Sequence, residues 1–254
     1  MNNETTILAL AGKGGVGKTS LSALTVRSLL EAHPNSRILA IDADPAVGLA
    51  TALGVEVSAT VDDIRRAFVQ TAEQGNASAA VELLGEAKFR LLDALEERGN
   101  LSFLAIGRPE AAGCYCKVNA YLKEVITRIA AHFDYVVIDG EAGIEQINRR
   151  VMETVTHLIL VSDGSKKGLQ VAKTIQRVAG ELVMYRKSGT IINRLPDTSL
   201  LPLLDTEGLE VLAVIGDDPK MTYSDLLGNS VFSLGADTAV CRGVKQALSS
   251  LNLI

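Results

Sequence analysis

Gly12-Lys13-Gly14-Gly15-Val16-Gly17-Lys18-Thr19 has the residue types and spacing of a phosphate-binding loop, or P-loop. The apolar run 5–11 precedes it and is expected to form a buried strand, and residues 20–32 follow it with the pattern of an amphipathic helix. The glycines allow backbone N–H groups to turn inward, where they and the positive end of the helix dipole attract phosphate oxygens. The sequence therefore predicts a nucleotide-binding site at the end of the first strand.

Individual residues of this loop have separate expected roles. We expect Lys18 to contact the terminal phosphates as a catalytic cation, and the Thr19 hydroxyl to bind Mg²⁺. ATP and ADP are the expected nucleotides. The other residues expected to surround the nucleotide are Gly12, Lys13, Gly14, Gly15, Val16, Gly17 and Ser20.

Strands and helices alternate along the chain. The expected strands are 5–11, 37–42, 101–106, 134–139, 156–162, 188–192 and 211–215, and the clearest helices are 20–32, 116–131, 166–181 and 237–250. This alternation predicts an α/β fold, a doubly wound and mostly parallel sheet flanked by helices. Apolar residues make up 47% of the chain and aromatic residues only 4%, as expected of a parallel sheet with both faces covered. We interpret residues 1–254 as a single domain with a helical insertion around 55–100, where no strand is expected.

Composition disfavours several classes of function. The net charge is −5 and no Lys/Arg-rich block occurs, which argues against nucleic-acid binding. No apolar run reaches membrane-spanning length, and the segment 244–254 carries one cation, too few for a membrane-surface helix. Three cysteines and no targeting segment are typical of a cytoplasmic protein.

Acidic residues follow two of the expected strands. Asp42 ends the strand 37–42, Asp44 comes two residues later, and Asp139 ends the strand 134–139. Ligands of doubly wound folds bind at the carboxyl ends of strands, so these acids are expected beside the P-loop. We expect Asp42 and Asp139 to support Mg²⁺ through water, and Asp44 to orient the attacking water as a catalytic residue.

Lys13 stands where the general P-loop pattern requires no particular residue. The loop resembles the deviant Walker A motif of the family that includes MinD, ParA, the arsenite-pump ATPase, the nitrogenase iron protein and the CooC nickel-insertion ATPases. The resemblance implies a homodimer in which Lys13 contacts the nucleotide of the partner chain. It also identifies 42–45 and 139–145 as the two switch segments.

Two further segments resemble the base-binding part of that family. Asn193 ends a short strand, and its amide offers both the donor and the acceptor that an adenine edge requires. The segment 215–219, with Asp217 and Pro219, resembles the one that closes over the base.

Cys114 and Cys116 form a Cys-x-Cys pair between the expected strand 101–106 and the start of the expected helix 116–131. Two thiolates bind a soft metal but leave a tetrahedral shell half filled, and a two-fold symmetric dimer would supply four sulfurs at one point. The residues alone leave Zn²⁺, Ni²⁺ and an Fe–S cluster open as occupants.

The segment 114–123 resembles the CooC-type nickel-insertion ATPases, which mature carbon monoxide dehydrogenase. That resemblance implies an ATPase that inserts nickel into carbon monoxide dehydrogenase or acetyl-CoA synthase. Two alternatives stay open: an ATP-driven electron-transfer protein with an inter-subunit [4Fe–4S] cluster, and a positioning ATPase of the MinD/ParA type. The cluster is disfavoured because no second cysteine follows Asp139 closely, as it does in the iron protein.

Overall fold

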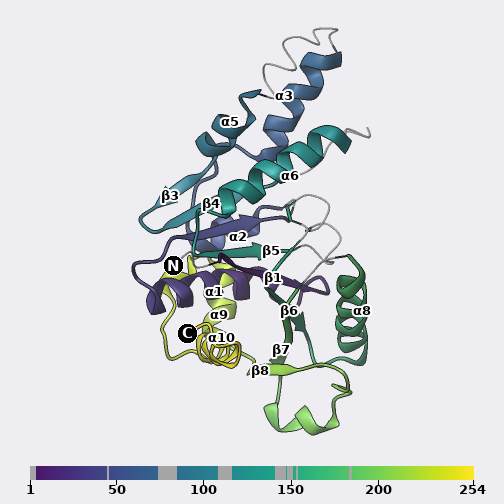
Figure 1. The fold of residues 1–254 in the computed structure, drawn as a ribbon. Coiled ribbons are helices and arrows are strands. Elements are labelled where there is room, and N and C mark those ends of the chain that lie inside the picture. Colours follow the sequence, from purple (N-terminus) through teal and green to yellow (C-terminus); the bar gives the residue numbers. More distant parts are fainter. Residues whose placement is uncertain are drawn as a thin grey trace.

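The structure, a computed structural model, describes residues 4–44, 46–73, 85–107, 116–140, 147, 151–152, 154–182 and 185–254. Its centre is a sheet of eight strands in the order β3-β4-β2-β5-β1-β6-β7-β8 (Figure 1). The strands are β1 Thr6–Gly12, β2 Ile38–Asp42, β3 Glu96–Arg98, β4 Leu101–Ala105, β5 Tyr135–Asp139, β6 His157–Ser162, β7 Lys187–Leu195 and β8 Val211–Gly216. Every neighbouring pair is parallel except β3 and β4. The expected mostly parallel α/β fold is therefore confirmed.

Helices connect the strands and cover the sheet. They are α1 Lys18–Ala32, α2 Gly48–Leu53, α3 Val61–Glu73, α5 Ala87–Asp93, α6 Cys116–Ala130, α8 Lys166–Leu182, α9 Pro219–Leu226 and α10 Ala239–Ser250, with 3-10 turns η1 Thr198–Leu203 and η2 Val231–Ser233. None of the helices in the described parts of the chain is long and apolar enough to cross a bilayer.

Alternate residues of the central strand β1 face two separate cores. Leu8 and Leu10 pack with the apolar sides of α1, α2 and α10. Ala9 and Ala11 belong to the other core, which includes residues of α3, α5, α6 and α8. Successive side chains of a strand point to opposite faces, so apolar residues at every position bury both faces of the sheet.

The segment 55–100 contributes α3 and α5, as its helical pattern indicates, together with the edge strand β3, which was not expected. β3 pairs with β4 across the two residues Gly99 and Asn100, and Gly99 has a φ of 62° that glycine adopts easily. Its sequence, Glu96-Glu97-Arg98, is charged, and charges are common on edge strands because they discourage pairing with other chains. β3 is thus a strand because it pairs with β4, although its sequence has no apolar pattern that would predict a strand.

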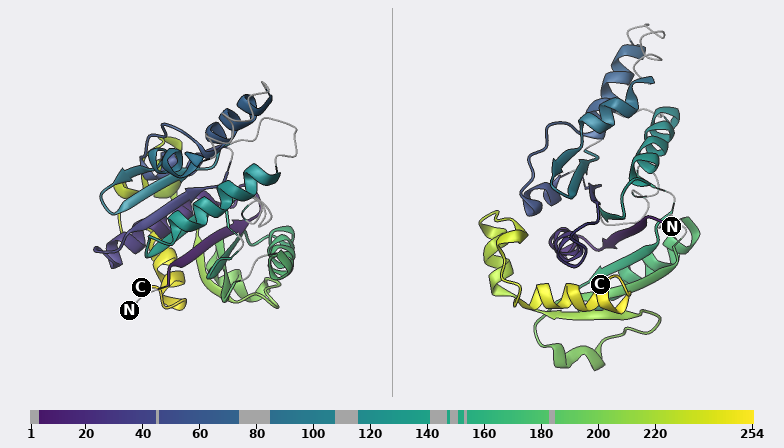
Figure 2. Two further views of the ribbon diagram at one scale, coloured as in Figure 1. Left: turned by 45° about the horizontal axis from the view of Figure 1, so that its top comes forward. Right: turned by 60° about the vertical axis from the view of Figure 1, so that its left-hand side comes forward.

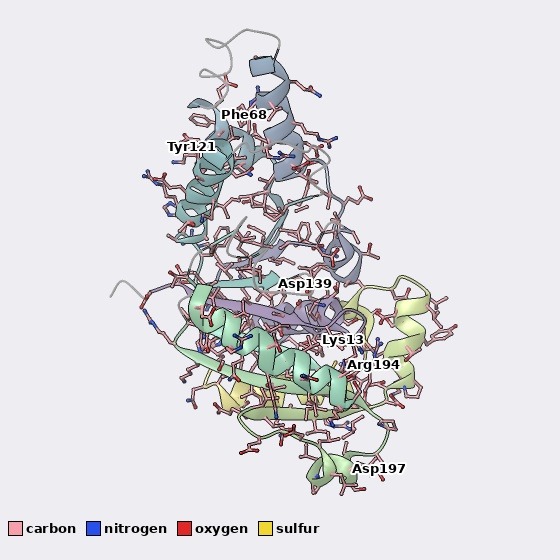
Figure 3. The ribbon with its side chains drawn as sticks, turned by 90° about the vertical axis from the view of Figure 1, so that its right-hand side faces the viewer. Lys13, Phe68, Tyr121, Asp139, Arg194 and Asp197 are labelled. Atoms are coloured by element: carbon pink, nitrogen blue, oxygen red, sulfur yellow. The ribbon has the colours of Figure 1, made fainter. Side chains whose placement is uncertain are left out.

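Helices α3, α5 and α6 contact one another and stand together at one end of the molecule, far from α10 (Figures 1 and 2). Phe68 of α3 is buried there and Tyr121 of α6 packs against the same core (Figure 3). α6 follows β4, so its first residue, Cys116, is reached from the carboxyl edge of the sheet. The P-loop leaves the same edge at the end of β1.

Candidate active site

The P-loop begins at the end of β1, which lies between β5 and β6 in the sheet. A Cβ at Gly12 would lie 2.0 Å from the carbonyl oxygen of Val161 on β6, so only glycine fits there. Gly15 and Gly17 have φ angles of 81° and 92°, a conformation that glycine reaches without a steric penalty. Gly17 is the N-cap of α1 and provides no side-chain hydrogen bond to the helix. The first amides of α1 therefore lack a side-chain cap, as expected of an anion-binding helix start.

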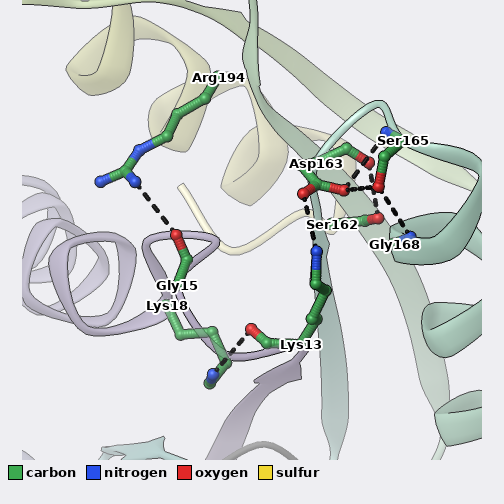
Figure 4. Close-up of polar contacts among 8 residues, drawn as sticks. All are labelled: Lys13, Gly15, Lys18, Ser162, Asp163, Ser165, Gly168 and Arg194. Carbon is green, nitrogen blue, oxygen red and sulfur yellow. Dashed lines mark hydrogen bonds and ion pairs between the residues drawn. The ribbon is translucent and has the colours of Figure 1, made fainter.

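Lys18, the first residue of α1, lies back over the loop. Its Nζ donates a hydrogen bond of 3.2 Å to the carbonyl oxygen of Lys13 (Figure 4), and the residue is 8% exposed. The ammonium is thereby held against the loop that would surround the phosphates. Contact with the terminal phosphates stays a prediction.

Asp42 and Asp139 end neighbouring strands and lie directly across from each other in the register of β2 and β5. Both carboxyls are buried, at 0% and 1% exposure. Asp42 accepts hydrogen bonds from the backbone N–H groups of Asp44 (3.0 Å) and Leu49 (2.9 Å). Burial, with added repulsion from Asp139, raises the pKa of Asp42 to about 7.

One carboxylate oxygen of Asp139 lacks a hydrogen-bond partner in the described part of the chain, whereas both oxygens of Asp42 accept one. Asp139 Oδ1 accepts a hydrogen bond of 2.9 Å from Ser22 Oγ, while Oδ2 has no partner among the described residues. Burial raises the pKa of Asp139 to about 6, against the opposing effects of the Thr19 and Ser22 hydroxyls and the Lys18 ammonium. An unpaired buried carboxylate oxygen beside a second acid is an arrangement that a divalent cation would stabilise.

These groups fit Mg²⁺. Thr19, Asp42 and Asp139 supply hydroxyl and carboxylate oxygens, which are its preferred ligands, and the cation would favour the charged form of both acids. When bound, Mg²⁺ neutralises charge on the phosphates. The ligand roles of these three residues stay predictions.

We expect the Asp139→Asn variant to be more stable than the parent near neutral pH when metal and nucleotide are absent. The pKa of Asp139 is about 6 in the fold against 3.8 ordinarily, so the native state holds more protons between these values. Its contribution to the free energy of unfolding is therefore largest below about pH 4, falls as the pH rises to about 6, and stays low above that. At about 1.36 kcal/mol per pKa unit, removing this charge is expected to add on the order of 3 kcal/mol.

Urea unfolding at about pH 5 and about pH 8 measures this difference. Asp134→Asn is the matched control, because Asp134 precedes the same strand at its opposite end and accepts a hydrogen bond from the backbone N–H of Arg37. Equal pH dependence in the parent and the Asp139→Asn protein would show that no strained carboxylate is present at this position.

Asp44 lies in the turn after β2. Its Oδ1 accepts a hydrogen bond of 2.9 Å from the backbone N–H of Ala46, and its own N–H is bonded to Asp42. This places Asp44 at the same sheet edge as Asp42, while its role in orienting water stays a prediction. Pro45 and residues 141–145 of the second switch lie outside the described residues.

Asn193 ties β7 to the P-loop. Its Nδ2 donates a hydrogen bond of 2.8 Å to the carbonyl oxygen of Val16, and the residue is 6% exposed. This bond fixes which end of the amide is the acceptor and leaves Oδ1 to accept from a donor such as the adenine amino group. The contact of Asn193 with adenine stays a prediction.

The region around Asn193 is hollowed into a pocket beside the P-loop. Its lining includes Gly17, Ser20, Asn193, Arg194, Asp217 and Thr222. Pro219 opens α9, and Asp218 caps that helix and also accepts a hydrogen bond of 3.0 Å from the backbone N–H of Val240. The structure thus brings Asp217 and Asn193 together with P-loop residues and places Pro219 in the adjoining helix start.

Lys13 is paired within its own chain. Its Nζ lies 3.3 Å from Asp163 Oδ2, and both side chains are about one-third exposed, at 36% and 33% (Figure 4). Burial alone would raise the pKa of Asp163, but hydrogen bonds from Ser165 and Lys13 bring it below its usual value. The sequence interpretation did not assign Asp163, although an acid directly after a buried strand next to β1 was the available signal.

Two other residues at the site were missed from sequence. Ser22, one turn into α1, bonds to Asp139, and Arg194 donates a hydrogen bond of 3.1 Å to the carbonyl oxygen of Gly15. Figure 3 shows Lys13, Asp139 and Arg194 gathered around the same part of the sheet. Neither Ser22 nor Arg194 has a distinctive sequence pattern, because each matters through a partner far along the chain.

Only one of the two residues of the expected soft-metal site belongs to the described residues. Cys114 lies outside the described residues, and Cys116 is described as the first residue of α6. Cys241 is a free, buried thiol on α10, in keeping with a structural role. In the parts of the chain that the structure describes, no three His, Cys, Asp or Glu residues are grouped to hold a metal ion.

Comparison with known proteins places the chain among P-loop ATPases. A family model described as an AAA domain matches residues 4–184. An uncharacterized ATP-binding protein of Methanocaldococcus jannaschii is 35% identical over 94% of this chain and 96% of its own length. The carbon monoxide dehydrogenase accessory protein CooC of Rhodospirillum rubrum is 29% identical over 95% of this chain and 94% of its own.

The solved structures show the same fold. The septum site-determining protein MinD of Pyrococcus horikoshii, complexed with Mg-ADP, superimposes with a TM-score of 0.68 at 21% identity and covers 98% of this chain and 96% of its own. At that identity the likeness concerns the fold alone.

Proposed function

The protein belongs to the AAA domain family of P-loop ATPases, and we propose that it is a dimerising metallochaperone that uses ATP to deliver nickel. Nickel is the cargo, bound by Cys114 and Cys116 of two chains. The client is carbon monoxide dehydrogenase or the related acetyl-CoA synthase. The likeness to the CooC accessory protein over nearly the full chain supports this choice of cargo and client.

One observation supports the proposal: α6, which begins at Cys116, is the helix that follows β4, and β4 is parallel to the strand that ends in the P-loop. β1, β2, β4 and β5 are parallel neighbours, so all of them end on the same edge of the sheet. Along the chain, Cys114 falls between β4 and α6, and β4 lies beside the strand that ends in Asp42. A partner chain that docks on the nucleotide edge would therefore also meet the cysteine segment.

Dimerisation links the two sites chemically. Two thiolates fill half of a tetrahedral shell, so a second chain completes the metal site. The same approach would bring Lys13 to the partner's phosphates, where a cation stabilises charge that develops during transfer. Lys18 would bind the phosphates within its own chain and Asp44 would orient the attacking water. Loss of the γ-phosphate would then relax the segments 42–45 and 139–145 and release the metal.

The ion pair between Lys13 and Asp163 opposes this closure, because Lys13 must leave Asp163 to reach another chain. We expect Asp163→Asn to lower the ATP concentration needed for dimerisation by about two- to fivefold, since a partly exposed ion pair contributes up to about 1 kcal/mol. Light scattering during an ATP titration measures the ATP concentration at which dimers form.

The matched control for that variant is Asp205→Asn, which breaks the surface pair between Lys173 and Asp205 (2.7 Å). If both variants dimerise at the same ATP concentration as the parent, the Lys13–Asp163 pair does not restrain closure.

Activation of a nickel-free client tests the proposed function. Nickel-loaded protein with ATP is expected to activate nickel-free carbon monoxide dehydrogenase, whereas the same protein with ADP is expected to be much less effective. No activation of either client, with nickel-independent and ATP-dependent pelleting on liposomes, would favour a positioning ATPase. A brown protein with an absorbance band after anaerobic purification would favour the electron-transfer alternative.

A further inference from the structure

Arg194 has an unusual backbone conformation beside the P-loop. Its φ is 57°, in the left-handed region, where a residue with a Cβ is sterically disfavoured. The register between β7 and β8 shifts between Ile192 and Leu195, so Arg194 sits in an irregular part of the strand pair. Glycine or asparagine would adopt this conformation more easily, yet the chain has an arginine here.

The side chain crosses to the phosphate loop. Arg194 Nη1 donates a hydrogen bond of 3.1 Å to the carbonyl oxygen of Gly15, and the side chain comes from outside the loop (Figure 4). The preceding residue, Asn193, binds the next carbonyl, that of Val16, at 2.8 Å. Two consecutive residues of β7 thus bind two consecutive carbonyls of the P-loop.

These carbonyls matter because of the way a P-loop binds phosphate. Its N–H groups must point inward together, and that requires its carbonyl groups to point outward. Gly14, Gly15 and Gly17 leave the loop free to adopt many other conformations, since glycine loses more backbone freedom on ordering than other residues do. Outward hydrogen bonds to the carbonyls would restrict that freedom before the nucleotide arrives.

We propose that Arg194 is a positioning residue that holds the Gly15 carbonyl outward and so preorganises the P-loop for the nucleotide. The left-handed conformation of Arg194 directs its guanidinium to this carbonyl. A charged donor makes a stronger hydrogen bond to a carbonyl than a neutral one. This role concerns nucleotide binding and is independent of the cargo that ATP moves.

Three variants test the proposal by ADP affinity, thermal unfolding and hydrogen exchange. In Arg194→Asn the side chain is too short to reach Gly15, while asparagine tolerates the left-handed backbone. We expect ADP to bind about tenfold more weakly, which corresponds to about 1.4 kcal/mol. We also expect faster amide exchange in residues 13–18 of the nucleotide-free protein, and an unchanged or higher melting temperature. Arg194→Lys keeps a charged donor and is expected to recover part of the affinity.

Asn252→Gly is the control for backbone strain. Asn252 has a φ of 59°, close to that of Arg194, and follows α10 far from the P-loop. The Asn252→Gly variant should leave ADP affinity and amide exchange in residues 13–18 unchanged. An Arg194→Asn protein that binds ADP like the parent, or whose loop exchanges at the parent rate, would overturn the proposal.

Discussion

A mixture of Lys13→Gln and Asp44→Asn chains is expected to hydrolyse ATP, although each variant alone is expected to be inactive. If Lys13 acts across the dimer, one site of each mixed dimer combines the Asp44 of the first chain with the Lys13 of the second. The other site lacks both. Random mixing would therefore restore about one quarter of the parental sites.

The loss in each single variant should be large. A cation supplied from a partner chain contributes about 10³-fold or more to phosphoryl transfer in related mechanisms. The Lys13→Gln chain should still bind ADP, because Lys18 and the backbone of the loop remain. Phosphate release measures the activity, and light scattering on the same sample shows whether dimers form. A dimeric mixture without recovered activity would mean that Lys13 acts within its own chain, where Asp163 already holds it at 3.3 Å.

Replacing both cysteines of the Cys-x-Cys pair should abolish tight binding of nickel. In a Cys114→Ser/Cys116→Ser protein no thiolate remains to fill the inter-subunit shell, and hydroxyls are poor ligands for these soft metals. We expect nickel and zinc affinity to fall by about 10³-fold or more, since thiolates dominate the stability of such sites. ADP affinity should not change.

Cys241→Ala is the matched control for the double variant. Cys241 is the remaining cysteine of the chain and is buried on α10, so its replacement removes a thiol without touching the proposed site. Competition with a chromophoric chelator, under anaerobic and reducing conditions, measures the nickel affinity of the parent, the double variant and the control. Parental nickel affinity in the double variant would exclude these thiols as the ligands.

The fold could be predicted from sequence because its strands are buried on both faces. Each of the seven parallel strands is a short apolar run with a turn signal, and the P-loop anchors the first of them. β3 escaped prediction because Glu96-Glu97-Arg98 has no apolar pattern and forms a strand only by pairing with β4.

The residues of the candidate site were likewise predictable only where they form local motifs. Local motifs predicted the P-loop, Asp42 and Asp139 as parts of the site, and the structure places the two acids opposite each other. Contacts between distant positions had no such signal: Lys13 and Asp163 are 150 positions apart, and Gly15 and Arg194 are 179 apart. Nothing local in the sequence indicates which charged side chain will lie beside the loop after folding.

Nickel stoichiometry measured together with molecular mass shows whether two ATP-bound chains share one metal site. Anaerobic, reduced protein would be titrated with Ni²⁺ in the presence of a non-hydrolysable ATP analogue, of ADP, and of neither, with the mass read by light scattering. We expect a dimer with the analogue that binds one nickel ion per two chains. A dimer that binds no nickel, or a monomer that binds one nickel ion per chain with equal affinity, would contradict a metal site shared between two ATP-bound chains.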